Sequence, residues 1–195
     1  LALLFAGVPM ATSAQAARMD NVQSTATTVA AELSRDSVYQ LPLKLTDANG
    51  RTFDWLIRRG QPQLVSMFYG SCRYICPLII EAGKAVDRSL TPSQRERLGV
   101  LMISMDPERD TPRALAALAR ERKVAPRWVL ASPRPGDVRS VAGVLDVRYR
   151  QLSDGEFNHT SALVLLDAEG RIVARTEQIG SKPDPEFIAA VKSLL

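Results

Sequence analysis

The feature that most restricts the fold of this chain is an alternation of short apolar runs with segments of helical spacing. The apolar runs, each of the length and character of a buried strand, are residues 64–69, 100–105 and 128–130. The segments with helical periodicity or helix-start signals that follow them are residues 77–90, 111–123 and 135–144. This order predicts neighbouring parallel strands joined by right-handed crossovers.

Hairpins extend this core at both ends. Residues 40–45 and 52–56 flank Asn49-Gly50, a strong signal for a two-residue turn. Residues 161–166 and 171–176 predict a second hairpin, before a last amphipathic helix at residues 185–195. With a cysteine pair at the first strand-to-helix junction, we predict an α/β, thioredoxin-like fold. It has a central mixed sheet flanked by helices and an N-terminal β-hairpin.

The length and the N-terminal composition predict one exported domain. The chain of 195 residues suffices for a single domain of ordinary size. Residues 1–16 combine an apolar run with a small-residue cleavage pattern, which predicts a secretory signal whose charged start is not in the sequence. Residues 17–36 are polar and predict a flexible tether, so the folded domain is expected at residues 37–195. We expect the periplasm or the outer face of the inner membrane, with an uncleaved N-terminal anchor as the alternative to cleavage.

The charge argues against a nucleic-acid partner. The net charge of +4 comes from scattered arginines such as Arg58, Arg95 and Arg120, without a Lys/Arg block or interleaved aromatic residues. Two interpretations stay open: a solvated basic surface, or a surface for a partner with an acidic docking face.

The two cysteines, Cys72 and Cys76, are placed for chemistry. A disulfide between them would close too short a loop to stabilise the fold much. They lie between a strand end and a helix start, where a helical turn places both sulfurs on one face and unpaired backbone N–H groups favour thiolates. Two thiolates select soft ions such as Cu(I) or zinc, and an imidazole would complete a three-coordinate set suited to Cu(I).

His159 is the only histidine in the chain, and it lies in a predicted loop at residues 153–160. In a thioredoxin-like sheet the start of the next strand faces the cysteine turn, where thioredoxins have a cis-proline that this chain lacks. We therefore expect His159 to be the third metal ligand. Asp106 follows the neighbouring strand and has two open interpretations: it orients the ligands through hydrogen bonds, or it ends the strand together with Pro107.

Three motifs occur in order along the chain. They are Cys72-Arg73-Tyr74-Ile75-Cys76-Pro77, Asp106-Pro107-Glu108-Arg109-Asp110-Thr111-Pro112, and His159-Thr160-Ser161 before Val164-Leu165-Leu166-Asp167 and Gly170. Together they resemble the Sco/SenC family of copper-delivery proteins over residues 37–195. The resemblance implies that Cys72, Cys76 and His159 bind copper, as Cu(I), Cu(II) or both, and that the cysteines also undergo thiol–disulfide chemistry. It implies a role in assembling the dinuclear copper centre of cytochrome c oxidase, with a cuproprotein acceptor such as an oxidase subunit and a thiol reductant as partners.

Two positions depart from the family pattern. The family commonly has Asp before the histidine, where this chain has Asn158, and many members have Thr where this chain has Gly70. Neither change removes a ligand, but either could direct the protein toward another copper or redox task.

Two alternatives to a copper chaperone remain. One is an enzyme, a thiol–disulfide oxidoreductase that reduces cysteines of a partner cuproprotein. The three residues between Cys72 and Cys76 and the missing cis-proline favour the chaperone. The other is an exported scaffold with an incidental disulfide. Met67, Met102 and Met105 are expected in the core rather than on a metal.

Overall fold

The computed structural model describes residues 32–195 of the chain. The predicted signal, residues 1–16, and most of the predicted tether lie outside the described residues. The last tether residues contact the domain, because the side-chain amide of Gln40 donates to the carbonyl oxygens of Leu33 and Ser34, at 3.0 and 3.3 Å. Among residues 32–195, none of the helices has both the length and the apolar character needed to cross a membrane.

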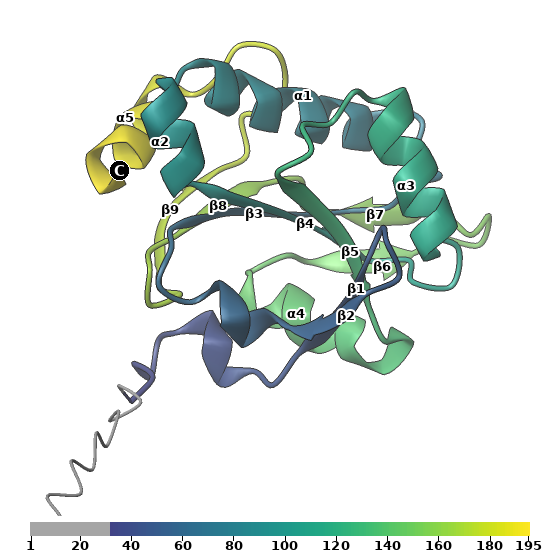
Figure 1. The fold of residues 1–195 in the computed structure, drawn as a ribbon. Coiled ribbons are helices and arrows are strands. Elements are labelled where there is room, and N and C mark those ends of the chain that lie inside the picture. Colours follow the sequence, from purple (N-terminus) through teal and green to yellow (C-terminus); the bar gives the residue numbers. More distant parts are fainter. Residues whose placement is uncertain (1–31) are drawn as a thin grey trace, which may run out of the picture. The chain divides into compact units, whose positions relative to one another are not determined.

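A seven-stranded sheet forms the centre of the unit that starts at Leu33, in the order β2-β1-β5-β4-β3-β8-β9 (Figure 1). Its strands are β1 (Lys44–Asp47), β2 (Thr52–Asp54), β3 (Gln63–Phe68), β4 (Gly99–Ser104), β5 (Trp128–Pro133), β8 (Leu163–Leu166) and β9 (Ile172–Thr176). The three central strands β3, β4 and β5 are parallel, and the outer pairings are antiparallel. The predicted mixed sheet and its N-terminal hairpin, β1–β2, are confirmed.

Helices cover both faces of this sheet. They are α1 (Ile75–Arg88), α2 (Pro92–Arg97), α3 (Pro112–Glu121), α4 (Val138–Val144) and α5 (Pro185–Leu194), with short 3₁₀ turns at Val38–Gln40, Trp55–Arg58 and Pro135–Asp137. The connections β3–α1–β4 and β4–α3–β5 step across the sheet in the same direction, so their common handedness places α1 and α3 on one face. Figure 1 shows α5 on that face and α4 on the opposite one.

Local capping signals set the starts of α2 and α3. The Thr91 hydroxyl accepts the N–H of Gln94, whose side chain accepts the N–H of Thr91, so α2 begins with a capping box. The Thr111 hydroxyl accepts the N–H of Ala114 at the start of α3. Helix α1 begins at Ile75, two residues before the predicted start at Pro77.

The core lies between the central strands and the two helical layers. Every residue of β3 and β4 is buried, as expected for parallel strands covered on both faces. Met67, Met102 and Met105 are all buried in this core, so their predicted packing role is confirmed.

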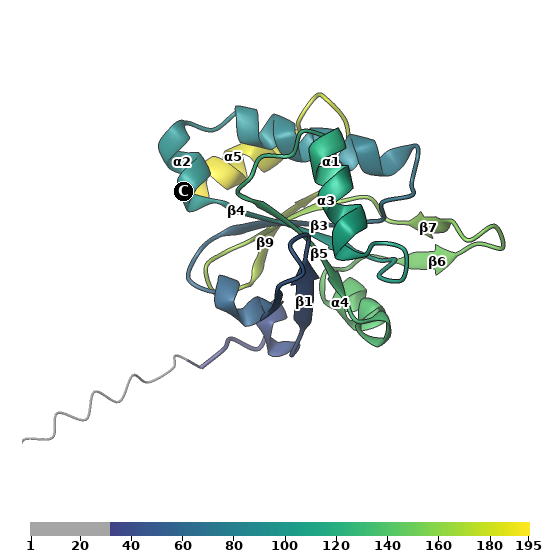
Figure 2. The same cartoon turned by 45° about the vertical axis from the view of Figure 1, so that its right-hand side comes forward.

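The segment that carries His159 departs from the sequence prediction. The segment predicted as a loop, residues 153–160, contains the strand β7 (Phe157–His159), which pairs with β6 (Tyr149–Gln151) in a separate two-stranded hairpin. The rings of Tyr149 and Phe157 contact each other across the pair, and the Phe157 ring also meets Tyr69 edge-on. These aromatic contacts stabilise strands whose other positions are polar and gave no strand signal. Figure 2 shows the hairpin extending from the body of the domain.

Candidate metal centre

The cysteine turn connects β3 to α1. Strand β3 ends at Phe68 and α1 starts at Ile75, so Cys76 lies in the first turn of the helix while Cys72 precedes it. The N–H of Cys76 donates to the Cys72 sulfur at 3.4 Å, and the N–H of Tyr69 donates to the Cys76 sulfur, also at 3.4 Å. Backbone N–H groups therefore hold both sulfurs at the positive end of α1.

His159, which is distant from the cysteines in the sequence, lies beside this turn. Its Nε2 lies 3.9 Å from the sulfur of Cys76, although 83 positions separate the two residues. Its Nδ1 lies 3.0 Å from the carbonyl oxygen of Thr160, which fixes the proton on Nδ1 and leaves the lone pair of Nε2 toward the sulfur. Burial lowers the pKa of His159, which favours the neutral imidazole that a metal requires.

The two thiols differ, whereas the sequence predicted thiolate character for both. Burial raises the pKa of Cys72, but hydrogen bonds from the N–H groups of Cys76 and Tyr74 outweigh it and the pKa lies below its ordinary value. Burial raises the pKa of Cys76 far above its ordinary value, and the neighbouring charge of Cys72 adds to this effect. Cys72 is thus the more acidic thiol of the pair, and Cys76 becomes a thiolate only when its proton is displaced.

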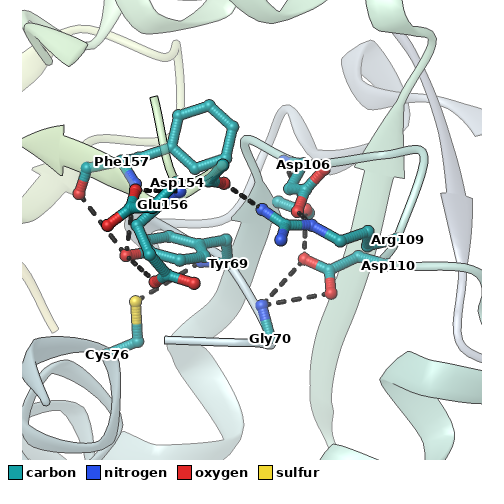
Figure 3. A network of polar contacts seen from close by, with 11 residues as sticks. Tyr69, Gly70, Cys76, Asp106, Arg109, Asp110, Asp154, Glu156 and Phe157 are labelled. Atoms are coloured by element: carbon teal, nitrogen blue, oxygen red, sulfur yellow. Dashed lines mark hydrogen bonds and ion pairs between the residues drawn. The ribbon is translucent and has the colours of Figure 1, made fainter. Parts of the chain in front are cut away.

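Asp106 contacts none of the candidate ligands directly and is connected to the site through Arg109. Its carboxylate pairs with Nε of Arg109 rather than with a candidate ligand, and the same guanidinium donates to the carbonyl oxygen of Gly155 (Figure 3). Gly155 lies in the turn of the β6–β7 hairpin, which carries His159. Asp106 and Arg109 therefore connect the end of β4 to the segment that positions the histidine.

The sequence analysis assigned no role to three further residues near the cysteines, Tyr69, Asp110 and Glu156. Asp110, which belongs to the second motif, accepts the N–H of Gly70 with both carboxylate oxygens (Figure 3). The Tyr69 hydroxyl donates to Glu156 at 2.9 Å, and its ring meets the His159 ring edge-on at 5.7 Å. Burial is the main cause that raises the pKa of Tyr69. One sequence signal could have found Tyr69 and Asp110. They follow β3 and β4, and the residues after the carboxyl ends of neighbouring parallel strands often form a binding site.

The two cysteine sulfurs and the His159 imidazole are donors that suit a soft ion, but the three are not close enough together in this structure to bind one. Within residues 32–195, no three His, Cys, Asp or Glu side chains lie close enough together to hold a metal ion. Cys76 and His159 are in contact, and the Cys72 sulfur is bonded to the N–H of Cys76. Two sulfurs and a neutral imidazole form a donor set that suits Cu(I).

Comparison with known proteins agrees with this chemistry. The SCO1/SenC family model matches residues 31–195. A copper-bound ScoI structure from Bradyrhizobium japonicum is 26% identical, with a TM-score of 0.67, and the match covers 80% of this chain and 98% of that one. An apo Sco1 structure from Thermus thermophilus is 25% identical, with a TM-score of 0.65 and coverage of 79% and 91%. A SCO2-like protein from Rickettsia conorii is 25% identical over 134 residues, or 66% of this chain. The chain spans 36% and 64% of the length of two curated relatives that it matches.

Proposed function

Because this chain belongs to the SCO1/SenC family, we propose that it is an exported copper chaperone that binds one copper ion through Cys72, Cys76 and His159. The observation that carries the proposal is the 3.9 Å contact between the Cys76 sulfur and Nε2 of His159. A thioredoxin-like protein that served only thiol chemistry would not need an imidazole with a free lone pair at its buried cysteine. The copper-bound ScoI relative supports the identity of the metal.

Copper is the cargo, and its release follows from the chemistry of the pair. Binding as Cu(I) requires both cysteines as thiolates, so loading displaces the proton of Cys76. Transfer to an acceptor proceeds by exchange of one ligand at a time. Oxidation of the two thiolates to a disulfide gives two electrons to an oxidant and removes both sulfur ligands, so a thiol reductant must restore the pair before reloading.

The setting of this function is also part of the proposal. The predicted signal favours the periplasm or the outer face of the inner membrane. Because that compartment is oxidising, a dedicated reductant is needed to keep the two cysteines reduced. A cuproprotein such as a cytochrome c oxidase subunit is the expected acceptor.

A second function is favoured by the unequal thiols. A nucleophilic Cys72 in front of a buried, protonated Cys76 is the arrangement of a thiol–disulfide oxidoreductase, in which the first attacks a partner disulfide and the second resolves the mixed disulfide. In that function His159 has no chemical role.

Competition with a chromophoric Cu(I) chelator tests the proposal on the reduced protein. Cys72→Ala, Cys76→Ala and His159→Ala should each lower the Cu(I) affinity, and His159→Ala should also abolish the thiolate-to-copper charge-transfer band of the Cu(II) form. Arg113→Ala is the control, because Arg113 is exposed on α3 and has no part in the candidate site.

The outcomes separate the two functions. Unchanged Cu(I) affinity in all three variants would refute the chaperone. If His159→Ala keeps full disulfide-reductase activity toward a partner cuproprotein and unchanged copper binding, the oxidoreductase stands instead.

A further inference from the structure

The β6–β7 hairpin has two unlike sides. The register pairs Tyr149 with His159 and Arg150 with Asn158, and directly opposed residues of an antiparallel pair point the same way. Tyr149 and His159 therefore share the side that packs on Tyr69. Arg150 and Asn158 share the other side, which we call the outer face of the hairpin.

The outer face carries positive charge that the rest of the described chain does not neutralise. Arg148 directly precedes β6, and the N–H of Thr160 donates to its carbonyl oxygen at 2.8 Å, which continues the pairing, so Arg148 shares a side with Arg150. Both arginines are exposed, and neither guanidinium has a hydrogen bond or an ion pair within residues 32–195. Of the acidic residues beside them, Glu177 is already paired with Arg175 at 3.0 Å and Asp106 with Arg109. Glu108 lines a second pocket with Arg150 but makes no ion pair with it. Two uncompensated charges therefore remain on this face.

These arginines border a hollow that reaches the candidate metal centre. Its volume is about 650 Å³, and its lining residues are Arg148, Tyr149, Arg150, Asn158, His159, Thr160, Ser161 and Glu177. Since His159 forms part of its wall, a ligand in the hollow lies against a candidate copper ligand.

We propose that this hollow docks an extended acidic segment of the protein that accepts copper from this chain. The proposal rests on the proposed function, and it names the chemistry of the partner. Alternate side chains along a strand are about 7 Å apart. Arg148 and Arg150 are such a pair, so alternate carboxylates of an extended segment match their spacing. Each guanidinium can take a carboxylate through two parallel hydrogen bonds.

The position of the hollow gives this docking a consequence for transfer. A segment held by Arg148 and Arg150 brings the acceptor to the His159 side of the copper, and His159 is the ligand that can leave without breaking a copper–sulfur bond. Acidic residues on the acceptor would also speed its encounter with this face at low ionic strength.

The test uses the metal-free, reduced protein and a fluorescein-labelled peptide of alternating glutamate and glycine, followed by fluorescence anisotropy. The double variant Arg148→Glu with Arg150→Glu should weaken binding by about tenfold or more. Asn158→Asp places a carboxylate opposite Arg150 and should weaken it by about threefold. The matched control is Arg113→Glu with Arg120→Glu on α3, which makes the same change of charge elsewhere and should leave binding within about twofold.

Two results would overturn the proposal. One is equal weakening by the control pair, which would make the attraction a property of net charge. The other is complete displacement of the peptide by a modest excess of inorganic phosphate, which would make the hollow a general anion site. Shifts of the backbone amide resonances of Arg148, Arg150 and Asn158 on peptide addition would support it.

Failure of docking can be told apart from failure of the chaperone function. The Cu(I) affinity of the Arg148 and Arg150 double variant should stay within about twofold of the parent, because neither residue is a ligand. A wrong copper site appears as unchanged Cu(I) affinity in Cys72→Ala, whatever the peptide does. A wrong docking surface appears only in the peptide titration.

Discussion

The backbone N–H of Gly70 donates to both carboxylate oxygens of Asp110, at 3.1 and 2.9 Å. The Ser104 hydroxyl donates to the same carboxylate at 2.5 Å. Asp110 is therefore bonded to Gly70, which follows β3, and to Ser104, the last residue of β4. The bond ties the chain just before Cys72 to the loop that precedes α3. A Cβ built on Gly70 would overlap Oδ1 of Asp110, so this position has no room for a side chain while the Asp110 carboxylate keeps its place.

Replacing this glycine should therefore loosen the cysteine turn. Gly70→Ala forces the Asp110 carboxylate out of its bonds, and we expect a loss of about 1–3 kcal/mol in the free energy of unfolding, measured by urea denaturation. Gly143→Ala is the control: it lies in α4 with open space around it, and alanine there should stabilise by up to about 1 kcal/mol. Equal effects of the two changes would contradict the account.

The buried carboxylate of Asp110 should make stability depend on pH. Burial raises its pKa above the ordinary value of 3.8, so the native state holds this proton at pH values where the unfolded state has lost it. The contribution of the protonated group to stability is full below 3.8 and is lost as the pH rises through the higher native pKa.

Asp110→Asn removes this titration while keeping the size of the side chain. The unfolding free energy of the parent minus that of the variant should therefore be largest in acid and fall as the pH rises. Urea denaturation at a series of pH values measures it, and a difference that grows with pH would show that the pKa of Asp110 is lowered instead.

The unequal thiols predict an order of chemical modification. Cys72 should react with iodoacetamide before Cys76, because its pKa is lowered by backbone N–H groups while burial raises that of Cys76. Peptide mass spectrometry after brief labelling of the reduced protein measures the ratio. Labelling of Cys76 first would contradict the assignment.

The sequence predicted the parts of this site that depend on local chemistry. Cys72 and Cys76 stand at a strand-to-helix junction, and Thr91 and Thr111 start helices, because capping and turn signals act within a few residues. His159 was expected near the cysteines only through the assumed order of the strands.

The parts that depend on distant partners were not predicted. Asp106 and Asp110 are four residues apart and look alike in the sequence, yet only Asp110 bonds the segment before the cysteines. The choice between them depends on which carboxylate faces Gly70 across the ends of β3 and β4, which no local pattern specifies. The β6–β7 hairpin was missed for a similar reason, since its aromatic side is recognisable only once Tyr69 is known to cover it.

Arg109 should control how firmly His159 is held. Its guanidinium pairs with Asp106 and donates to the carbonyl oxygen of Gly155, so it ties the hairpin turn to the end of β4. Arg109→Ala breaks both bonds without touching a ligand. We expect the Cu(I) affinity to fall by about tenfold, or about 1.4 kcal/mol, because the hairpin must then be ordered when copper binds. Amide hydrogen exchange in β7 should speed up in the same variant.

Arg109→Lys distinguishes the effect of the two hydrogen bonds of Arg109, to Asp106 and to Gly155, from the effect of its positive charge. A lysine keeps the charge but has a single donor group, which cannot serve the carboxylate and the carbonyl in the same planar fork, so it should recover less than half of the lost binding free energy. Arg113→Ala, which removes an exposed arginine from α3, should change neither copper affinity nor exchange. If Arg109→Ala speeds exchange in β7 but leaves the Cu(I) affinity unchanged, the position of His159 is set by Tyr69 and Thr160 alone, and the tie serves only the stability of the hairpin.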